Sequence, residues 1–169
     1  ATSTIDSLPL IVASILSKKL AEGLDALVLD IKVGNGAFIT CEKQAQELIS
    51  WFQQVSSTLG LDLNCSTSQM NVPMSFSVGN ALEIHEAIEY LTGERRHPYL
   101  DELVRRLAKE LLVMTTCKSN PEEAYKRVAQ ALDSGAAAEK FERMIHFLGG
   151  PADLLENHNK YLEQAPVVR

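Results

Sequence analysis

Apolar residues between positions 8 and 20 recur every three or four residues, which places them on one face of an α-helix. These residues are Leu8, Ile11, Val12, Ile15, Leu16 and Leu20. Asp6 or Ser7 can cap the start of such a helix, and Gly23 favours its end. The pattern therefore predicts an amphipathic helix over residues 8–20.

The next segments predict strands that alternate with a helix. Residues 24–33 are almost continuously apolar, which is typical of a strand in a sheet that is covered on both faces. Residues 42–59 show helical spacing of apolar positions up to Gly60, and residues 61–65 indicate a second short strand. A strand–helix–strand order implies that the two strands pair in parallel.

The remainder of the chain is predicted to begin as a loop and to continue as helices. Turn-forming residues are frequent in residues 66–80. Helical spacing then recurs in residues 81–90, 99–114, 121–132 and 136–147, followed by a short turn over 152–157 and a tail, 164–169, that resembles the start of a strand. The predicted fold class is α/β: helix-rich, with a partial parallel or mixed sheet covered by helices.

The composition narrows the functional classes. The net charge is −6 and the 16 basic residues form no stripe, which argues against nucleic acid as the main partner. No apolar run reaches the roughly 20 residues that a membrane helix needs, and the first residues lack the features of a signal peptide. Cys41, Cys65 and Cys117 are widely spaced, as expected for reduced thiols. We therefore expect a cytoplasmic protein that binds neither nucleic acid nor membrane.

Ser14 and Lys18 lie four residues apart on the first predicted helix, so both side chains project from one side of it. A hydroxyl and an ammonium at this spacing can serve a ligand that carries adjacent carbonyl-type acceptors. The O2, N3 and O4 edge of a pyrimidine is such a ligand. On the residues alone, a surface serine and a solvated lysine are the favoured interpretation of this pair.

Two further groups of residues carry weaker signals. The glycine turn Val33-Gly34-Asn35-Gly36-Ala37-Phe38 permits a close backbone approach, as in a phosphate site, although a structural turn is the more frequent use of such a pattern. Glu83 and Glu86 near a helix start favour capping, with a cation-ligand role for Glu86 as the alternative. The four histidines show no metal-binding spacing and are expected to be surface or packing residues.

The whole chain resembles the thymidine phosphorylase and pyrimidine nucleoside phosphorylase family. The similarity begins with the first predicted helix and continues through the glycine turn to the last predicted elements. The stretches that carry it are residues 4–11, 13–20, 23–30, 33–38, 70–71, 79–83, 91–94 and 149–157. These stretches follow the family order, and several are long, so the resemblance is specific.

The resemblance implies reversible phosphorolysis of thymidine, with inorganic phosphate as co-substrate and no required cofactor. Ser14 and Lys18 match the residues that bind the pyrimidine, and Lys18 also takes the catalytic role of offsetting negative charge on the leaving base. Met74, Ser77 and Glu86 match positions at which some members bind a monovalent cation such as potassium, although Ser77 stands where alanine is common. No covalent nucleophile is expected.

The resemblance also implies that this chain is a central fragment. The arginine that contacts the base in the family would precede Ala1, the phosphate loop would lie further upstream, and a β-rich region would follow Arg169. We expect residues 1–22 to contribute to a small helical domain and residues 23–169 to form the middle of the α/β domain of a homodimeric parent. The piece alone is expected not to catalyse phosphorolysis.

Three alternatives remain open at the level of sequence. A broad pyrimidine nucleoside phosphorylase would also accept uridine, and the base-binding pair does not decide between the two sugars. A non-catalytic helical binding module would retain the fold without turnover. A relative that acts on nucleoside monophosphates would require an additional basic pocket, and none is visible in this acidic sequence.

Overall fold

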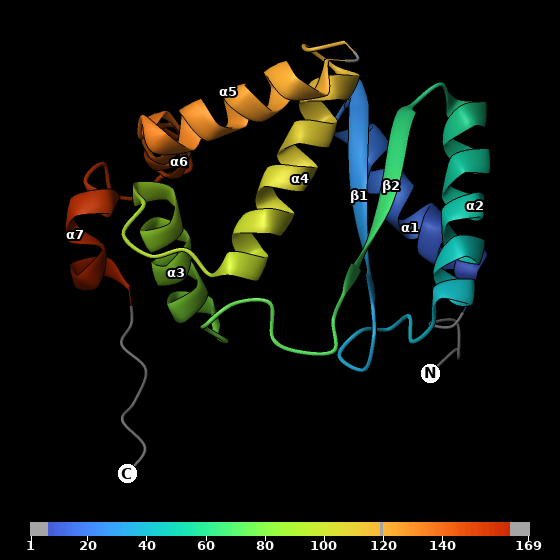
Figure 1. Cartoon of the computed structure of the whole chain (residues 1–169), viewed down its shortest axis with the longest axis horizontal. Coiled ribbons are helices and arrows are strands. Elements are labelled where there is room, and N and C mark those ends of the chain that lie inside the picture. The colour runs from blue at the N-terminus through green and yellow to red at the C-terminus, as the bar shows by residue number, and fades with distance from the viewer. Residues whose placement is uncertain (1–6, 119, 163–169) are drawn as a thin grey trace. The chain divides into compact units, whose positions relative to one another are not determined.

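The computed structural model describes residues 7–118 and 120–162, which form two compact units (Figure 1). The α/β unit comprises Ala1–Pro73 and Leu107–Pro121, and the helical unit comprises Met74–Arg106 and Glu122–Arg169. The predicted α/β fold class is confirmed, because helices alternate with a parallel two-stranded sheet. None of the helices in the described ranges combines the length and the apolar character that crossing a bilayer requires.

The α/β unit contains helix α1 (Leu8–Ala21), strand β1 (Ala26–Val33), helix α2 (Glu42–Leu59) and strand β2 (Asp62–Gln69). β1 and β2 pair in parallel, in register from Ala26 opposite Asp62 to Val33 opposite Gln69, which confirms the predicted pairing. The expectation that the second strand ends at residue 65 was wrong. Its polar second half continues the ladder because residues 30–33 of β1 offer backbone partners there.

One face of the sheet packs against α1 and α2 and forms the core. Val12 and Leu16 of α1, Ile31 of β1 and Phe52 of α2 are all buried in it. Burial of large apolar side chains of this kind typically contributes about 1.5–3 kcal/mol each. Because Val12 and Leu16 face this core, the opposite side of α1 remains exposed.

The opposite face of the sheet carries a polar cluster near the carboxyl ends of the two strands. Lys32 Nζ donates to Ser68 Oγ at 3.0 Å and forms an ion pair with Asp30. Ser68 Oγ donates in turn to Asp30 Oδ2 at 2.8 Å. The cluster links β1 to β2 through side chains, and it satisfies polar groups that would be costly to bury alone.

The helical unit contains helix α3 (Asn80–Thr92), the first half of α4 (Pro98–Met114), α5 (Pro121–Asp133), α6 (Ala136–Phe147) and α7 (Leu154–Tyr161). The helices α3 to α6 agree with prediction to within two residues at either end. The short turn expected over 152–157 was wrong, because α7 forms there. The side chains of Asn157 and Tyr161 both donate to the Asp153 carboxylate, which ties the helix to its own start. The tail 164–169 lies outside the described residues.

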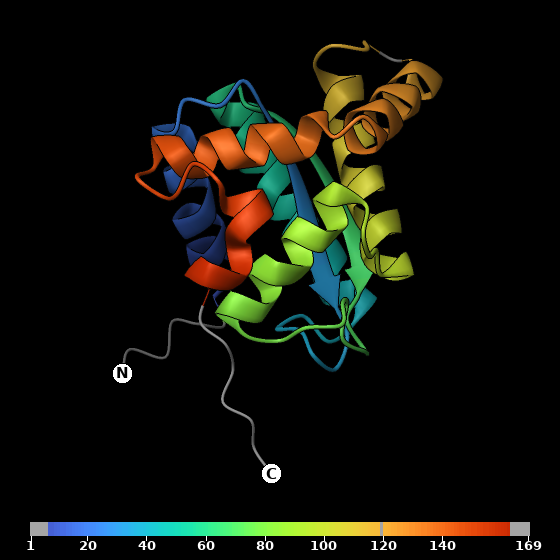
Figure 2. The ribbon, with the colours of Figure 1, turned by 90° about the vertical axis from the view of Figure 1, so that its left-hand side faces the viewer.

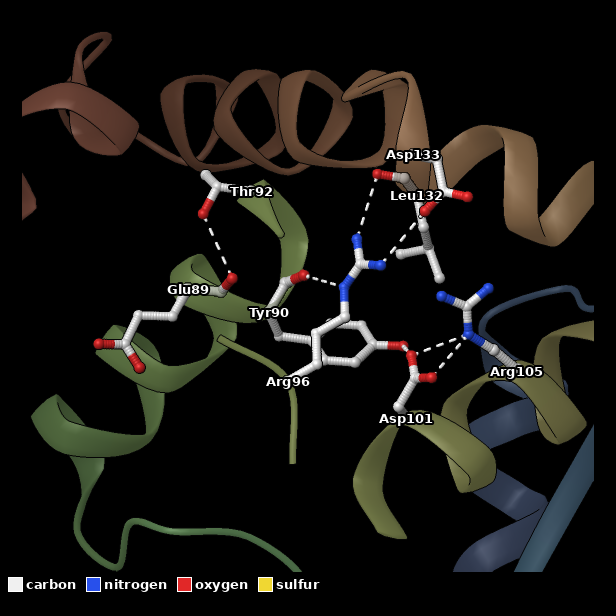
Figure 3. A network of polar contacts seen from close by, with 8 residues as sticks. All are labelled: Glu89, Tyr90, Thr92, Arg96, Asp101, Arg105, Leu132 and Asp133. Atoms are coloured by element: carbon white, nitrogen blue, oxygen red, sulfur yellow. Dashed lines mark hydrogen bonds and ion pairs between the residues drawn. The ribbon is translucent and has the colours of Figure 1, made fainter. Parts of the chain in front are cut away.

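Figure 3 shows the polar network that joins three helices of the helical unit. Arg96 donates to the carbonyl of Tyr90 at 2.9 Å and to the carboxylate of Asp133 at 3.2 Å. Asp101 accepts from the Tyr90 hydroxyl at 2.9 Å and from Arg105 Nε at 2.8 Å. Burial, reinforced by Asp101, raises the pKa of Tyr90 to about 12. The network therefore keeps the phenol protonated and fixes α3 to the start of α4 and the end of α5.

Candidate functional site

Ser14 and Lys18 lie one turn apart on the exposed side of α1, as the sequence predicts. Val12 and Leu16 hold the opposite side of the helix in the core, and this contact determines the direction of the exposed pair. The neighbouring Lys19 forms an ion pair with Glu22 at 3.1 Å. Within the part of the chain that the structure describes, no such pair holds Lys18. Its ammonium is therefore available to a ligand.

An apolar pocket of about 510 Å³ lies beside α1 within the α/β unit, and neither Ser14 nor Lys18 is among its lining residues. Ile11 and Ile15 of α1 form one wall, and they occupy the edge of the helix next to Ser14 and Lys18. Phe38, which is 56% exposed, also lines the pocket. Its other lining residues are Leu29–Lys32, Gly36, Ala37, Ile39, Leu48, Phe52 and Met70. The arrangement suits a planar ring with one apolar edge and one edge of hydrogen-bond acceptors.

The glycine turn shapes this pocket by packing against residues that follow β2. Asn35 N–H donates to Asn71 Oδ1 at 3.0 Å, and Gly36 N–H donates to the carbonyl of Met70 at 2.8 Å. The N–H groups of Gly34 and Ala37 donate to carbonyls within the turn region, at 3.0 Å each. The N–H groups of these four consecutive residues, 34–37, are thus all used inside the protein. These hydrogen bonds favour a structural turn over a phosphate-binding loop. Residues 70 and 71, which accept two of them, could not be identified from the sequence around the turn.

Glu86 lies in α3 and holds the loop that precedes this helix. It is 4% exposed, and its two carboxylate oxygens accept from Phe76 N–H at 2.9 Å and Ser77 N–H at 2.8 Å. Burial opposes ionisation, but these hydrogen bonds outweigh it and lower the pKa of Glu86 below its ordinary value. Capping was the expected role of the acidic residues here, and Glu83 does accept from Gly79 N–H at 3.0 Å.

The residues matched to a cation site all belong to the helical unit. Met74 and Ser77 belong to the loop that Glu86 holds. Their carbonyls and the carboxylate would offer oxygen ligands, which suit a hard cation. The carbonyl of Ser77 accepts from Ser75 Oγ at 3.3 Å, and Glu86 is already satisfied by N–H donors. Carbonyl and carboxylate oxygens are ligands that a hard cation accepts, and the cation role of these three residues stays a prediction. In the described ranges, no group of three or more His, Cys, Asp or Glu residues is placed to hold a metal.

The role of Glu86 as a loop anchor gives a pH-dependent prediction. A carboxylate with a lowered native pKa stabilises the fold above its unfolded pKa, and this contribution is lost as the pH falls through the native value. We expect Glu86→Gln to destabilise the chain by about 2 kcal/mol at neutral pH. The glutamine side chain has one oxygen and one NH2 group, so one of the two loop N–H groups would face the NH2 group and lose its acceptor. Thermal unfolding between neutral and acidic pH measures this loss.

Glu83→Gln is the matched control for this measurement, because Glu83 lies on the same helix and is exposed. Its substitution should change stability far less at every pH. The difference between native and Glu86→Gln proteins should shrink as the pH falls, since protonation removes the same hydrogen-bond acceptors. A difference that stays constant down to the acid limit would contradict the assignment.

Cys65 and three of the histidines in the described part are packed against other side chains. Burial raises the pKa of the Cys65 thiol to about 11, which keeps it protonated at neutral pH. His97 packs edge-on against Phe76, with ring centroids 4.6 Å apart, and His85 packs in the same way against His158 at 4.8 Å. These contacts agree with the expectation that the histidines are packing residues.

Comparison with known proteins places these features in context. The family described as "Glycosyl transferase family, a/b domain" matches residues 1–138. Curated thymidine phosphorylases from Mesorhizobium japonicum, Sinorhizobium fredii and Colwellia psychrerythraea are 46%, 44% and 42% identical to this chain. The matches cover 98% or 99% of this chain, but the chain spans only 38% of the length of each of these relatives.

Proposed function

Because the chain belongs to this glycosyl transferase family, we propose that it forms the central part of a thymidine phosphorylase. The reaction would be the reversible phosphorolysis of thymidine to thymine and 2-deoxy-α-D-ribose 1-phosphate. The names of the relatives support this assignment. The observation that carries it in the structure is the exposed Ser14–Lys18 pair on α1, the helix whose Ile11 and Ile15 line the apolar pocket.

In this proposal the pyrimidine lies with its apolar edge toward Ile11 and Ile15 and its acceptor edge toward Ser14 and Lys18. As the bond from the sugar to the base breaks, negative charge develops on the pyrimidine ring. The Lys18 ammonium stabilises that charge, and this stabilisation is larger in the transition state than in the bound substrate. Inorganic phosphate attacks the sugar directly, so the enzyme forms no covalent intermediate.

Other parts of the proposal concern the complete protein. The N–H groups of residues 34–37 in the glycine turn already donate to acceptors within this chain. We therefore assign the phosphate contacts to another segment of the parent. A potassium ion at Met74, Ser77 and Glu86 would support the loop before α3 without entering the chemistry. We further propose that the parent is a cytoplasmic homodimer.

A chimera tests the proposed function. In it, the segment of one of these relatives that matches the present chain is replaced by residues 1–169. We expect the chimera to release thymine from thymidine only when phosphate is present, and the 169-residue chain alone to release none. Turnover of uridine at a similar rate would assign the broader pyrimidine specificity. A folded chimera without any turnover, beside an active unmodified relative, would contradict a catalytic role and favour the binding module.

A further inference from the structure

The glycine turn after β1 contains the one Asn-Gly sequence of the chain, at Asn35 and Gly36. Figure 2 shows this turn at the lower end of β1, beside the segment that leaves β2. The Asn35 side chain is exposed. An asparagine followed by glycine loses its side-chain amide more readily than other asparagines, because glycine has no Cβ atom to hinder attack on the amide. The sequence of the turn therefore makes Asn35 a candidate for chemical modification.

The modification is intramolecular and requires only water as a co-reactant. The backbone nitrogen of Gly36 attacks Cγ of Asn35, so that a new C–N bond closes a succinimide ring and the bond from Cγ to the amide nitrogen breaks. The amide leaves as ammonia, which takes up the proton that the Gly36 nitrogen loses. Water then opens the ring. Opening at one carbonyl leaves aspartate, and opening at the other leaves isoaspartate, in which the main chain runs through the side-chain carbon atoms.

The fold requires glycine at position 36, so the labile sequence is part of the turn. A Cβ atom at Gly36 would lie 2.9 Å from the Met70 carbonyl oxygen. This oxygen belongs to the backbone, so relief of such a contact would require the chain itself to shift. A side chain that slowed the reaction by hindering the attack would therefore also disturb the turn.

The same turn restrains the atom that must attack. The Gly36 N–H donates to the Met70 carbonyl at 2.8 Å, and the Asn35 N–H donates to Asn71 Oδ1 at 3.0 Å. The Met70 N–H donates in turn to the Val33 carbonyl at 2.7 Å, which ties this partner to the end of β1. A backbone nitrogen whose proton is held by a carbonyl is a poor nucleophile, because it must lose that proton to attack. Deamidation of Asn35 then requires local opening of the turn.

An isoaspartate at position 35 would be incompatible with these hydrogen bonds. It adds one methylene to the main chain between residues 35 and 36, so the two N–H groups lose the spacing at which Met70 and Asn71 accept them. Residues 36–38 follow directly and line the apolar pocket. A change at residue 35 therefore acts on the pocket wall, although Asn35 itself does not line the pocket.

We propose that Asn35 is a deamidation site that the folded turn protects, and that its isoaspartyl product disrupts the pocket wall. The hydrogen bond from Gly36 to Met70 is the restraint, and local opening of the turn sets the rate. The proposal is independent of the reaction assigned to the parent, because it involves neither Ser14 nor Lys18.

The rate of deamidation at Asn35 tests the protection. The 169-residue chain and a synthetic peptide of residues 30–41 are incubated in the same mildly alkaline buffer, and mass spectrometry of proteolytic fragments follows both products. We expect the folded chain to react at least about tenfold more slowly than the peptide, since only the open turn reacts. Equal rates in the chain and the peptide would overturn the proposal.

Asn71→Ala tests whether local opening sets the rate. The substitution removes the acceptor of the Asn35 N–H and should raise the rate about fivefold, the usual effect of one hydrogen bond on an opening equilibrium. Gly23→Ala is the matched control, because it strains the same unit at the opposite end of β1, and it should leave the rate nearly unchanged. No acceleration by Asn71→Ala, or equal acceleration by both variants, would contradict the restraint by the turn. Circular dichroism confirms that both variants remain folded.

Hydrogen exchange tests the effect on the pocket wall. After incubation, chromatography separates the isoaspartyl chain from the unmodified chain, and the amides of Gly36 and Ala37 should have lost their protection in the isoaspartyl chain. Freshly purified Asn35→Asp is the matched control, because it introduces the same negative charge without lengthening the main chain, and it should keep the protection. Retained protection in the isoaspartyl chain, or an equal loss in Asn35→Asp, would contradict disruption by the lengthened main chain.

Discussion

Lys18→Met should lower the kcat for thymidine phosphorolysis by the chimera by at least about a hundredfold, the usual effect of removing a preorganised group from a developing charge. Methionine keeps the length and apolar stem of the side chain but removes its charge. Since Lys18 is exposed on α1 and the core side of the helix is unchanged, the fold should be retained. Steady-state kinetics with varied thymidine and saturating phosphate measure the effect.

The division of the loss between kcat and KM distinguishes the proposed role from simple binding. An interaction made only in the transition state lowers kcat and kcat/KM equally, whereas uniform binding raises KM alone. Lys19→Met is the matched control, because Lys19 is the adjacent lysine and pairs with Glu22. An equal loss of activity in both variants, or a change confined to KM, would contradict charge stabilisation by Lys18.

Much of the fold follows from apolar periodicity. The helix over residues 42–59 is observed with the predicted bounds, because its apolar positions and Gly60 mark both the face and the end. The second half of β2 was missed because Ser66 and Ser68 resemble loop residues. They pair with β1 through the backbone. When a neighbouring strand offers hydrogen-bond partners, a polar residue joins the sheet in spite of its own preference for loops.

The candidate site was predictable only in part. The resemblance and the helical spacing placed Ser14 and Lys18 together, and the structure agrees that both are exposed on one side of α1. The pocket beside α1 depends on how α1 packs against β1 and the glycine turn, which no local pattern specifies. The anchoring of the loop by Glu86 was missed for a related reason: the backbone N–H groups that it accepts from leave no signal in side-chain identity.

Gly34→Ala should destabilise the chain by about 3 kcal/mol, which combines backbone strain with a steric conflict. Gly34 has φ of 140°, a conformation that residues with a side chain rarely adopt. A Cβ atom there would lie 2.5 Å from Asn71 Oδ1 and 2.9 Å from the backbone carbon of Met70. Asn71 can rotate away only by giving up its hydrogen bond with Asn35, and the Met70 backbone is fixed by its pairing with the turn.

Gly23→Ala separates the two contributions, because Gly23 also has a positive φ, of 70°, but a Cβ atom there would meet nothing within 4 Å. Its cost should be the conformational part alone, about 1 kcal/mol. For a chain of this size 1 kcal/mol corresponds to about 2–4 °C, so the melting temperature should fall several degrees further for Gly34→Ala than for Gly23→Ala. Equal shifts would mean that the turn moves away from Met70 and Asn71 at little cost. The pocket wall at Gly36 to Phe38 would then be adaptable rather than preformed.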